Sequence, residues 1–521
     1  MKNRLTMVVA GVAIAAAAIG CNNDNLTNLN KNPNSPSSVG PGPLFTRATN
    51  TSVQRFLGAG FDLRQTEFVA QHMAEVQYPS DDSYATLQGA NVQVTFNGAY
   101  SAELEDLKKV VQQGDFAKNA AISGPAQVLQ AWIYENLTDT WGDVPYSQAL
   151  AGDSTGGSFT PAYDPQKSIY ASLMSTLTRA SAGMTAATGA GLGAADPIYG
   201  GDLSAWQKFS NSLHARLALR LVNVDPTTAN TELKAAFTAP GGLITSNADM
   251  AQLVWPGDGI YNNPWSANFQ ARDDNRISLT FYNILAPASG PVDPRLPIFA
   301  QPTQADPSVY AGSPNGVGSI AGKYLKTTSR PGAIFYAGAT AYGNFGSTAN
   351  AKTPSYLMTY AEVAFIQAEA AERNLGGLTP GQAAAFYNAG ILASMAQWGV
   401  SSSAAATYLA NSSIAYKAGV AGLKQIAVQK WIALYSDGSQ AWASYRQTCQ
   451  PSSLKPGPAA VVLYIPRRFP YPISEISVNP ANVTAAIARL GGTKQDNFGG
   501  MVYWDQPQNA PTCQDVNLNL P

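Results

Sequence analysis

The chain has 521 residues, of which 45% are hydrophobic and only 12% are charged, and its formal net charge is −1. Because 32 Lys and Arg stand against 33 Asp and Glu, no positive excess exists to neutralise phosphates, and we expect no nucleic-acid partner. Two His and three Cys nearly exclude a Cys/His zinc cluster, so we expect no metal and no other cofactor. A surface made polar by neutral side chains suits neutral, hydroxyl-rich or peptide-like ligands.

The N-terminus predicts export. Lys2 and Arg4 precede an apolar run over residues 7–19. As a helix this run is about 20 Å long, shorter than the hydrocarbon core of about 30 Å. We therefore predict a secretory signal peptide over residues 1–20.

The end of this run predicts lipid attachment. A small residue, Gly20, directly precedes Cys21, as in a bacterial lipobox, whose Cys is acylated and becomes the mature N-terminus. Residues 21–43 follow as a polar tether rich in Asn, Pro, Ser and Gly. The alternative is an ordinary signal peptide cut near a chance Cys. We predict that Cys21 carries two acyl chains, which suffice for stable membrane attachment.

Residues 44–521 are predicted to form one mostly helical domain. Apolar side chains recur with helical spacing in most of it, and Asp164-Pro165 and Thr379-Pro380 are typical of helix starts. The expected helices are 45–76, interrupted near 57–61, then 101–113, 124–137, 165–182, 204–222, 356–374, 380–398, 420–435 and 439–446. From Pro451 the chain is expected to be rich in loops.

The segment 356–374 and its successor 380–398 predict a helix–turn–helix unit. Small side chains such as Ala361, Ala364 and Ala368 line the first helix and allow close approach of the second. This packing is typical of tetratricopeptide-like repeats.

Between residues 239 and 353 apolar side chains do not recur with helical spacing over any long stretch, because Gly, Pro, Asn and Ser interrupt the chain every few residues. We predict a large irregular region with short strands. Long loops in an otherwise helical domain are usually functional.

Aromatic side chains in loops are the predicted ligand face. A ring in a Pro/Gly/Asn loop can stack on a sugar or side-chain face, while amides and an Arg donate hydrogen bonds. The alternative is that these rings form a satellite core that anchors the loop. We expect Trp265 and Tyr261 to line the site and Trp255 to flank it. The full set of candidates is Tyr78, Tyr84, Trp255, Tyr261, Asn262, Trp265, Asn268, Phe269 and Arg272.

Catalytic and metal-binding chemistry is weakly indicated. A glycosidase needs two carboxyl groups that face each other across a cleft, and no spacing in the sequence pairs any two acids. Helix capping or loop hydrogen bonding explains each of them. His72 could contact a ligand, whereas His214 is expected in the core or a groove, and Asp273-Asp274-Asn275 is a weak cation motif. The acids considered are Asp139, Asp143, Asp273, Asp274 and Glu475.

Two cysteines remain in the predicted mature chain after Cys21. Cys449 and Cys513 are free to form a disulfide in an oxidising compartment. A bridge would close a loop of about 65 residues and stabilise the fold by roughly 4 kcal/mol in the chain-entropy model. The alternative is two buried thiols, which mass spectrometry without reductant would detect.

Six stretches resemble the SusD/RagB family of nutrient-binding outer-membrane lipoproteins, and they follow the family's order behind a lipobox. One departure is Tyr445-Arg446-Gln447, where relatives often carry two consecutive Arg. The stretches are LNKNPN (29–34), TDTWGDVPYSQAL (138–150), WQKFSNSLHARLALRL (206–221), YLMTYAEVAFIQAEAAERN (356–374), QKWIALYSDGSQAWASYRQT (429–448) and IPRRFPYPISEISVN (465–479) with VYWD (502–505).

The resemblance implies an all-α fold of tetratricopeptide-like helix pairs whose irregular loops carry the ligand face. It implies no catalysis, and it implies capture of oligosaccharides or peptides for a SusC-like, TonB-dependent β-barrel transporter. The protein would lie at the outer membrane, held by its lipid and facing the cell exterior. The motifs themselves look structural: Asp143, Pro145 and Tyr146 as a turn, Trp431 and Arg446 as scaffold.

Two rival functions stay open. The first is an exported glycan- or peptide-processing enzyme, which product analysis would reveal. The second is a purely structural lipoprotein that stabilises the barrel, which a ligand-binding screen would separate from a nutrient binder.

Overall fold

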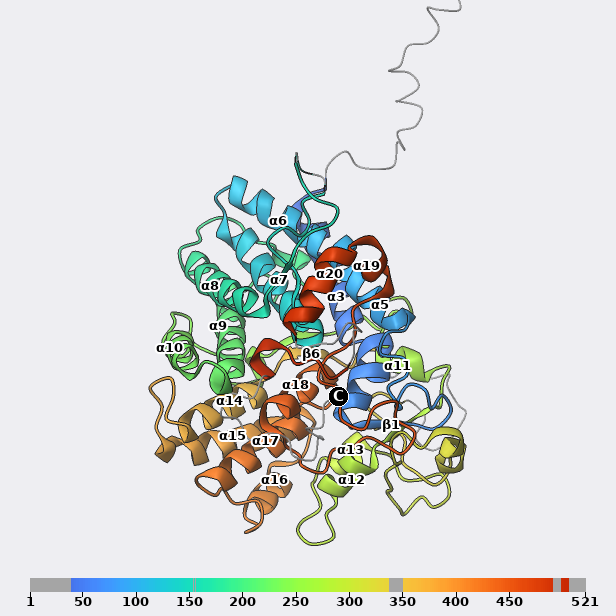
Figure 1. Ribbon diagram of the computed structural model, residues 1–521. Coiled ribbons are helices and arrows are strands. Elements are labelled where there is room, and N and C mark those ends of the chain that lie inside the picture. Colours follow the sequence, from blue (N-terminus) through green and yellow to red (C-terminus); the bar gives the residue numbers. More distant parts are fainter. Residues whose placement is uncertain (1–38, 153, 155, 337–349, 491–497, 506–521) are drawn as a thin grey trace, which may run out of the picture.

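The computed structural model describes residues 39–152, 154, 156–336, 350–490 and 498–505, and helices dominate it (Figure 1). The predicted signal peptide and Cys21 lie outside these residues, as does most of the tether. The first half contains α3 (Pro41–Phe56), the π-helix η1 (Ala59–Thr66), α4 (Glu67–Ala70), α5 (Ala90–Gly98), the π-helix η2 (Ala99–Leu104), α6 (Glu105–Phe116), α7 (Ala120–Trp141), α8 (Gln166–Thr185), α9 (Leu203–Arg220) and α10 (Pro226–Phe237).

The second half begins with short helices and ends with longer ones. The irregular region holds α11 (Pro264–Phe269), α12 (Leu279–Leu285) and α13 (Leu296–Phe299). The longer helices are α14 (Tyr360–Glu372), α15 (Pro380–Gln397), α16 (Ser402–Leu409), α17 (Val420–Ala433) and α18 (Gly438–Thr448), followed by α19 (Ile473–Val478), α20 (Pro480–Arg489) and the 3-10 turn η7 (Tyr503–Asp505). Within the part of the chain that the structure describes, no helix is long and apolar enough to span a bilayer.

Successive helices pack as pairs. Helices α6 to α10 each contact the next one along the chain, and α14 packs on α15 and α17 while also touching α9. In Figure 1 these helices form one side of the molecule, and α11 to α13 lie toward the other with β1. The close approach of α14 and α15 depends on Gly390, because a Cβ there would lie 2.8 Å from the Phe365 ring. The predicted all-α fold built from helix pairs is confirmed.

Side-chain capping fixes the starts of several helices. The side chain of Asp202 accepts hydrogen bonds from the first turn of α9, and Asp437 does the same for α18. Thr379 and Gln382 form a capping box at the start of α15, with Pro380 in the first turn, as predicted. Asp164 does not cap α8, because its carboxylate accepts from the backbone N–H groups of Tyr146 and Ser147 instead.

Within the described residues, six short strands form three two-stranded antiparallel sheets: β1 (Met73–Glu75) with β5 (Asn275–Ile277), β2 (Val144–Pro145) with β3 (Tyr163–Asp164), and β4 (Ala251–Leu253) with β6 (Ser355–Met358). Two helix predictions are wrong at these strands. The chain leaves the helical conformation at Gln71, with φ of 59°, and enters β1. Likewise β6 precedes α14, which Thr359 caps. Pairing with the irregular region overrides the local helical pattern at both places.

The irregular region is built as predicted from short elements, and aromatic side chains anchor it to the helices. The Tyr435 ring lies at the centre of this packing, with ring centroids 4.3 Å from Phe299 and 5.6 Å from Phe281. Trp431, fully buried in α17, packs on Phe281 at 5.3 Å. The scaffold role expected for Trp431 therefore agrees with its position.

Candidate functional site

The strand pair β1–β5 brings together two candidates that are far apart in the sequence. Glu75 pairs with Asn275 in an antiparallel register. Continuing this register past the strand ends places residue 78 opposite residue 272. The Arg272 guanidinium lies 4.4 Å from the centroid of the Tyr78 ring, within cation–π distance.

The pair is partly exposed and pre-organised. Tyr78 keeps 47% of its surface in solvent and Arg272 keeps 27% of its side chain. Arg272 Nε donates to Asp274 Oδ2 at 2.7 Å, which fixes the guanidinium over the ring. The amide of Gln77 donates to the backbone oxygen of Asp273 at 3.2 Å and lies beside the pair. We call Gln77, Tyr78 and Arg272 the β1–β5 platform.

Two buried acids, Glu75 and Asp82, hold the backbone next to the platform. Glu75 Oε1 accepts hydrogen bonds from the backbone N–H groups of residues 76, 77 and 78, which holds the turn that presents Tyr78. Burial, together with the charge of Asp274, raises the pKa of Glu75 to about 8. Burial also raises the pKa of Asp82 to about 7, and its Oδ2 accepts from the Glu75 N–H at 3.0 Å.

Four of the predicted loop aromatics are not exposed, and that expectation is corrected. Asn263 caps the short helix α11, which turns Trp265 and Phe269 inward. The Trp265 ring packs on Phe335 at 4.9 Å, and only 2% of Trp265 is exposed. An irregular segment has few backbone contacts to hold it, so buried rings do so instead. The buried four are Tyr84, Trp255, Trp265 and Phe269.

The remaining candidates lie on the loop before α11 and on α11 itself. Tyr261 is 50% exposed in a turn where Asp258 Oδ1 accepts its backbone N–H at 2.7 Å. Asn262 accepts from the Gly259 N–H at 3.1 Å, and Asn268 is partly buried on α11. Among the described residues, no ring contact or hydrogen bond joins Tyr261 to the β1–β5 platform. Of the predicted face, the structure thus brings together only Tyr78 and Arg272.

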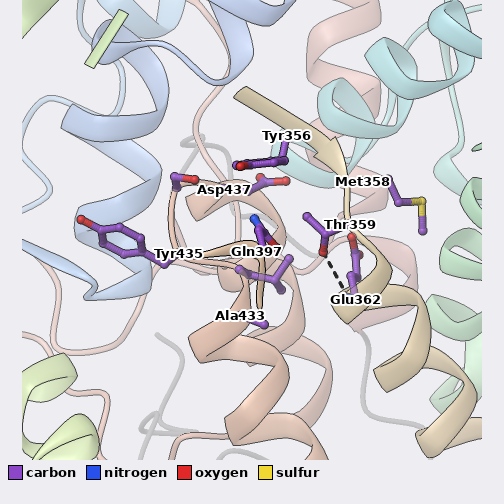
Figure 2. Close-up of a pocket in the computed structure, with 10 residues that line it drawn as sticks. Tyr356, Met358, Thr359, Glu362, Gln397, Ala433, Tyr435 and Asp437 are labelled. Atoms are coloured by element: carbon purple, nitrogen blue, oxygen red, sulfur yellow. Dashed lines mark hydrogen bonds between the residues drawn. The ribbon is translucent and has the colours of Figure 1, made fainter. Parts of the chain in front are cut away.

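A cavity at the start of α14 is too small for a nutrient (Figure 2). Its volume is about 10 Å³, which is close to the space of a single water molecule. Tyr356, Gln397 and Asp437 border it, and the Thr359 hydroxyl accepts the Glu362 N–H at 3.2 Å. Burial raises the pKa of Asp437 well above its ordinary value. This cavity belongs to the packing between α14, α15 and α17.

The acids flagged in the sequence have structural partners. Asp143 accepts from the Gln166 N–H and pairs with Arg489 at 2.6 Å. Asp273 pairs with Arg276 and Arg330, and Asp274 pairs with Arg272. Glu475 Oε2 accepts from the Tyr163 hydroxyl at 2.7 Å. In the described part of the chain, no three His, Cys, Asp or Glu side chains form a group that could hold a metal ion.

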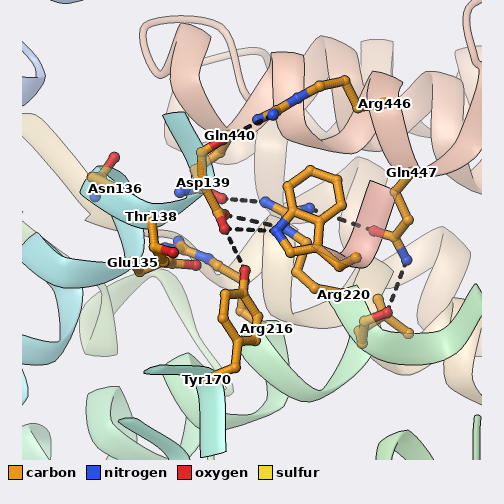
Figure 3. A network of polar contacts seen from close by, with 12 residues as sticks. Glu135, Asn136, Thr138, Asp139, Tyr170, Arg216, Arg220, Gln440, Arg446 and Gln447 are labelled. Carbon is orange, nitrogen blue, oxygen red and sulfur yellow. Dashed lines mark hydrogen bonds and ion pairs between the residues drawn. The ribbon is translucent and has the colours of Figure 1, made fainter. Parts of the chain in front are cut away.

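Asp139 belongs to a buried polar network between α7, α8, α9 and α18 (Figure 3). Its Oδ1 accepts hydrogen bonds from the Tyr170 hydroxyl and from the Trp504 indole. Arg446, as expected for scaffold, lies over Trp442 at 3.6 Å and donates to the backbone oxygen of Asp139. Gln447, next to Arg446, donates from its amide to the backbone oxygen of Leu219 at 2.9 Å.

Neither histidine is available to a ligand. His72 is fully buried, its Nδ1 lies 2.9 Å from Glu67 Oε2, and burial lowers its pKa to about 3. His214 is 3% exposed, and its Nε2 lies 2.7 Å from Glu232 Oε2. The possible ligand contact of His72 is therefore corrected to a structural role.

Cys449 is disulfide-bonded in the structure. It ends α18 in the left-handed conformation, with φ of 56°. Its expected partner Cys513 lies outside the described residues, so the pairing between these two cysteines stays a prediction.

Sequence reasoning missed the residues that build the platform around Tyr78. Gln77 adds an amide, and Glu75 and Asp274 orient the turn and the guanidinium. Nothing in the local pattern marks Gln77 or Glu75, and Asp274 was marked only within a weak cation motif. Their roles in the platform depend on the pairing of β1 with the distant strand β5. The register of β1 and β5 is the only signal that joins them.

Comparison with solved structures shows the fold class. The chain is similar to a chitin-binding SusD homolog from Flavobacterium johnsoniae, with 26% identity, a TM-score of 0.73 and coverage of 90% of this chain and 98% of that one. It is also similar to a SusD homolog from Bacteroides fragilis, with 23% identity, a TM-score of 0.73 and coverage of 90% and 100%. A comparison with curated proteins finds no match.

The family follows from the sequence match. Residues 33–472 match the model of a SusD-like family described as "Starch-binding associating with outer membrane". The chain therefore belongs to the SusD-like family, as its motifs predicted.

Proposed function

We propose that this protein is a non-catalytic, surface-exposed binding protein that captures neutral oligosaccharides. The observation that carries the proposal is the β1–β5 platform, where an exposed Tyr78 ring lies against Arg272 with Gln77 alongside. An aromatic ring stacks on the apolar face of a sugar, while a guanidinium and an amide donate to its hydroxyl groups. This set discriminates by shape and hydrogen bonding and needs no charge on the ligand.

The comparisons support this choice of ligand class. The family description names starch, and one similar structure is that of a chitin-binding homolog. We accordingly choose malto-oligosaccharides and chitin oligosaccharides as the first ligands to test. A peptide ligand is the alternative within the same function, because the platform would also stack on a side chain.

Binding to the platform should depend on the Tyr78 ring. We expect Tyr78→Ala to weaken oligosaccharide binding by on the order of 1–3 kcal/mol, the scale of a single aromatic anchor. The melting temperature should change little, since about half of the side chain is already in solvent. Isothermal titration calorimetry and thermal melting of the same samples measure both quantities.

The matched control is Phe116→Ala. Phe116 ends α6 and is 93% exposed, so its removal also deletes a surface ring. It should leave affinity and melting unchanged. If Tyr78→Ala and Phe116→Ala bind every tested oligosaccharide as the unmodified protein does, the platform is not the capture site.

The enzyme alternative is tested by its products. Each flagged acid already makes a structural contact, which argues against a free acid–base pair. Incubation of the pure protein with both oligosaccharide series, followed by mass analysis, should return the ligands at full length. Shortened products that disappear on mutation of one of these acids would establish an enzyme instead.

We further propose delivery of the ligand to a SusC-like, TonB-dependent transporter at the outer membrane, with the protein anchored through acylated Cys21 and facing the cell exterior. Family membership supports this arrangement, since the family description names association with the outer membrane. A binding protein held beside a transporter raises the local concentration of ligand at its entrance.

The anchor is tested by Cys21→Ser. Without the thiol no acyl chain can attach, and the protein should move from the membrane fraction to the soluble fraction. Cell fractionation in a strain that lacks the transporter removes the contribution of that partner. A variant that stays membrane-bound in this strain contradicts the lipobox interpretation.

A further inference from the structure

A cavity of about 450 Å³ shares no residue with the β1–β5 platform. The end of α5, the π-helix η2, the segment after β2 and helix α19 form its walls. Figure 1 shows α19 beside α5 at the same end of the molecule. A volume of this size lies within the range of roughly 300–1,000 Å³ that is usual for small-ligand sites.

Hydrogen bonds between distant segments hold the cavity open. The Asn97 amide donates to Ser474 Oγ at 3.0 Å, which joins α5 to α19. The Tyr100 hydroxyl donates to the backbone oxygen of Pro145 at 2.8 Å, which joins η2 to β2. The walls thus come from four parts of the chain that are fixed before any ligand arrives, and such preorganisation favours binding.

One aromatic ring in the cavity is exposed without a packing role. Phe159 is 85% exposed, although it is among the most apolar of side chains. A Cβ at Gly152 would lie 3.0 Å from Cε1 of this ring, so the ring lies close to the Gly152 backbone. Beside a cavity, such a ring offers a free face on which a ligand can stack.

The polar lining selects the ligand class. Glu475 is the single charged side chain among the described residues that border the cavity, so an anionic ligand is disfavoured. Its Oε2 accepts from the Tyr163 hydroxyl, which orients the carboxylate. Ser101 and Ser158 also line the cavity. An aromatic face and a hydrogen-bond acceptor in one cavity match a pyranose, which has an apolar face and donating hydroxyl groups at its edge.

We propose that this cavity is a second saccharide-binding site, which takes the end of a neutral oligosaccharide by stacking on Phe159 and by hydrogen bonding to Glu475. The site deepens the proposed function, because two separate sites on one molecule let a single glycan chain or its neighbours bind with avidity. It does not depend on the β1–β5 platform, which is tested by a different variant.

The test titrates the full-length protein with N-acetylglucosamine hexamer and with maltoheptaose by isothermal titration calorimetry. For at least one of these ligands we expect two binding events. Phe159→Ala should weaken one event about tenfold or more and leave the other intact. Tyr78→Ala should show the reverse pattern. Because Phe159 is 85% exposed, its removal should not change the melting temperature.

Two further variants make the result specific. Glu475→Gln keeps the shape of the side chain but removes its charge, and it should weaken the same event as Phe159→Ala. Phe116→Ala, a ring removed from α6, should weaken neither. Affinities that are the same in Phe159→Ala as in the unmodified protein overturn the second site, whatever Tyr78→Ala does. A loss confined to Tyr78→Ala keeps the proposed function and rejects this inference, and binding of neither ligand rejects both.

Discussion

Replacing Arg216 with methionine is expected to lower the free energy of unfolding by about 3–5 kcal/mol, the usual cost of leaving buried charges without their partner. Arg216 Nη1 lies 3.0 Å from Glu135 Oε2, and Nη2 lies 2.6 Å from Glu362 Oε2. All three side chains are at most 5% exposed. Urea denaturation of the variant and the unmodified protein measures the difference.

The size of this loss should depend on pH. Burial already raises the pKa of Glu135 to about 8, although the charge of Arg216 lowers it. Without Arg216 the pKa rises further. A carboxyl group whose pKa is higher in the folded than in the unfolded state lowers the stability of the folded protein as the pH rises. The loss in the free energy of unfolding caused by Arg216→Met should therefore be smaller at pH 5 than at pH 8.

Lys109→Met is the matched control for Arg216→Met. Lys109 forms an ion pair with Glu105 at 3.3 Å, and 48% of the Lys109 side chain and 24% of the Glu105 side chain are in solvent. Such exposed pairs contribute about 0–1 kcal/mol, so this variant should unfold nearly as the unmodified protein does. Equal losses in the free energy of unfolding in the two variants would show that burial does not strengthen the contribution of the Arg216 ion pairs in the network of Figure 3.

Trp265→Ala is expected to destabilise the protein by about 3–5 kcal/mol, the cost of removing a large buried ring. The ring packs between Phe335, at 4.9 Å, and Tyr435, at 5.9 Å. Thermal melting and urea denaturation measure the effect.

The matched control for Trp265→Ala is Tyr261→Ala in the preceding loop. Tyr261 is 50% exposed, and surface substitutions of this kind usually change stability by about 0.5 kcal/mol or less. A Trp265→Ala protein that melts normally but binds oligosaccharides weakly would show that Trp265 belongs to the ligand-binding site. A large loss of stability assigns it to the core.

The sequence by itself determined the family and most of the longer helices, whereas α5, α10, α16, α19 and α20 were not predicted. Helix α15 begins where Thr379-Pro380 predicts it, because capping depends on residues within one turn. The irregular character of residues 239–353 was also predictable, since Gly and Pro act on their own backbone. The family motifs were visible because they form the buried contacts that the fold requires, as the Trp141 indole does when it donates to the Pro470 oxygen at 3.1 Å.

Only the tertiary structure decided which loop residues are exposed and which of them meet. Trp265 and Tyr261 have similar local sequence surroundings, yet one lies in the core and the other in solvent. Strands β1 and β6 lie in segments with a helical pattern, and pairing with distant strands overrode it. Tyr78 and Arg272 meet for the same reason. A strand register is set by hydrogen bonds between segments far apart in the chain, and no property of either segment alone encodes its partner.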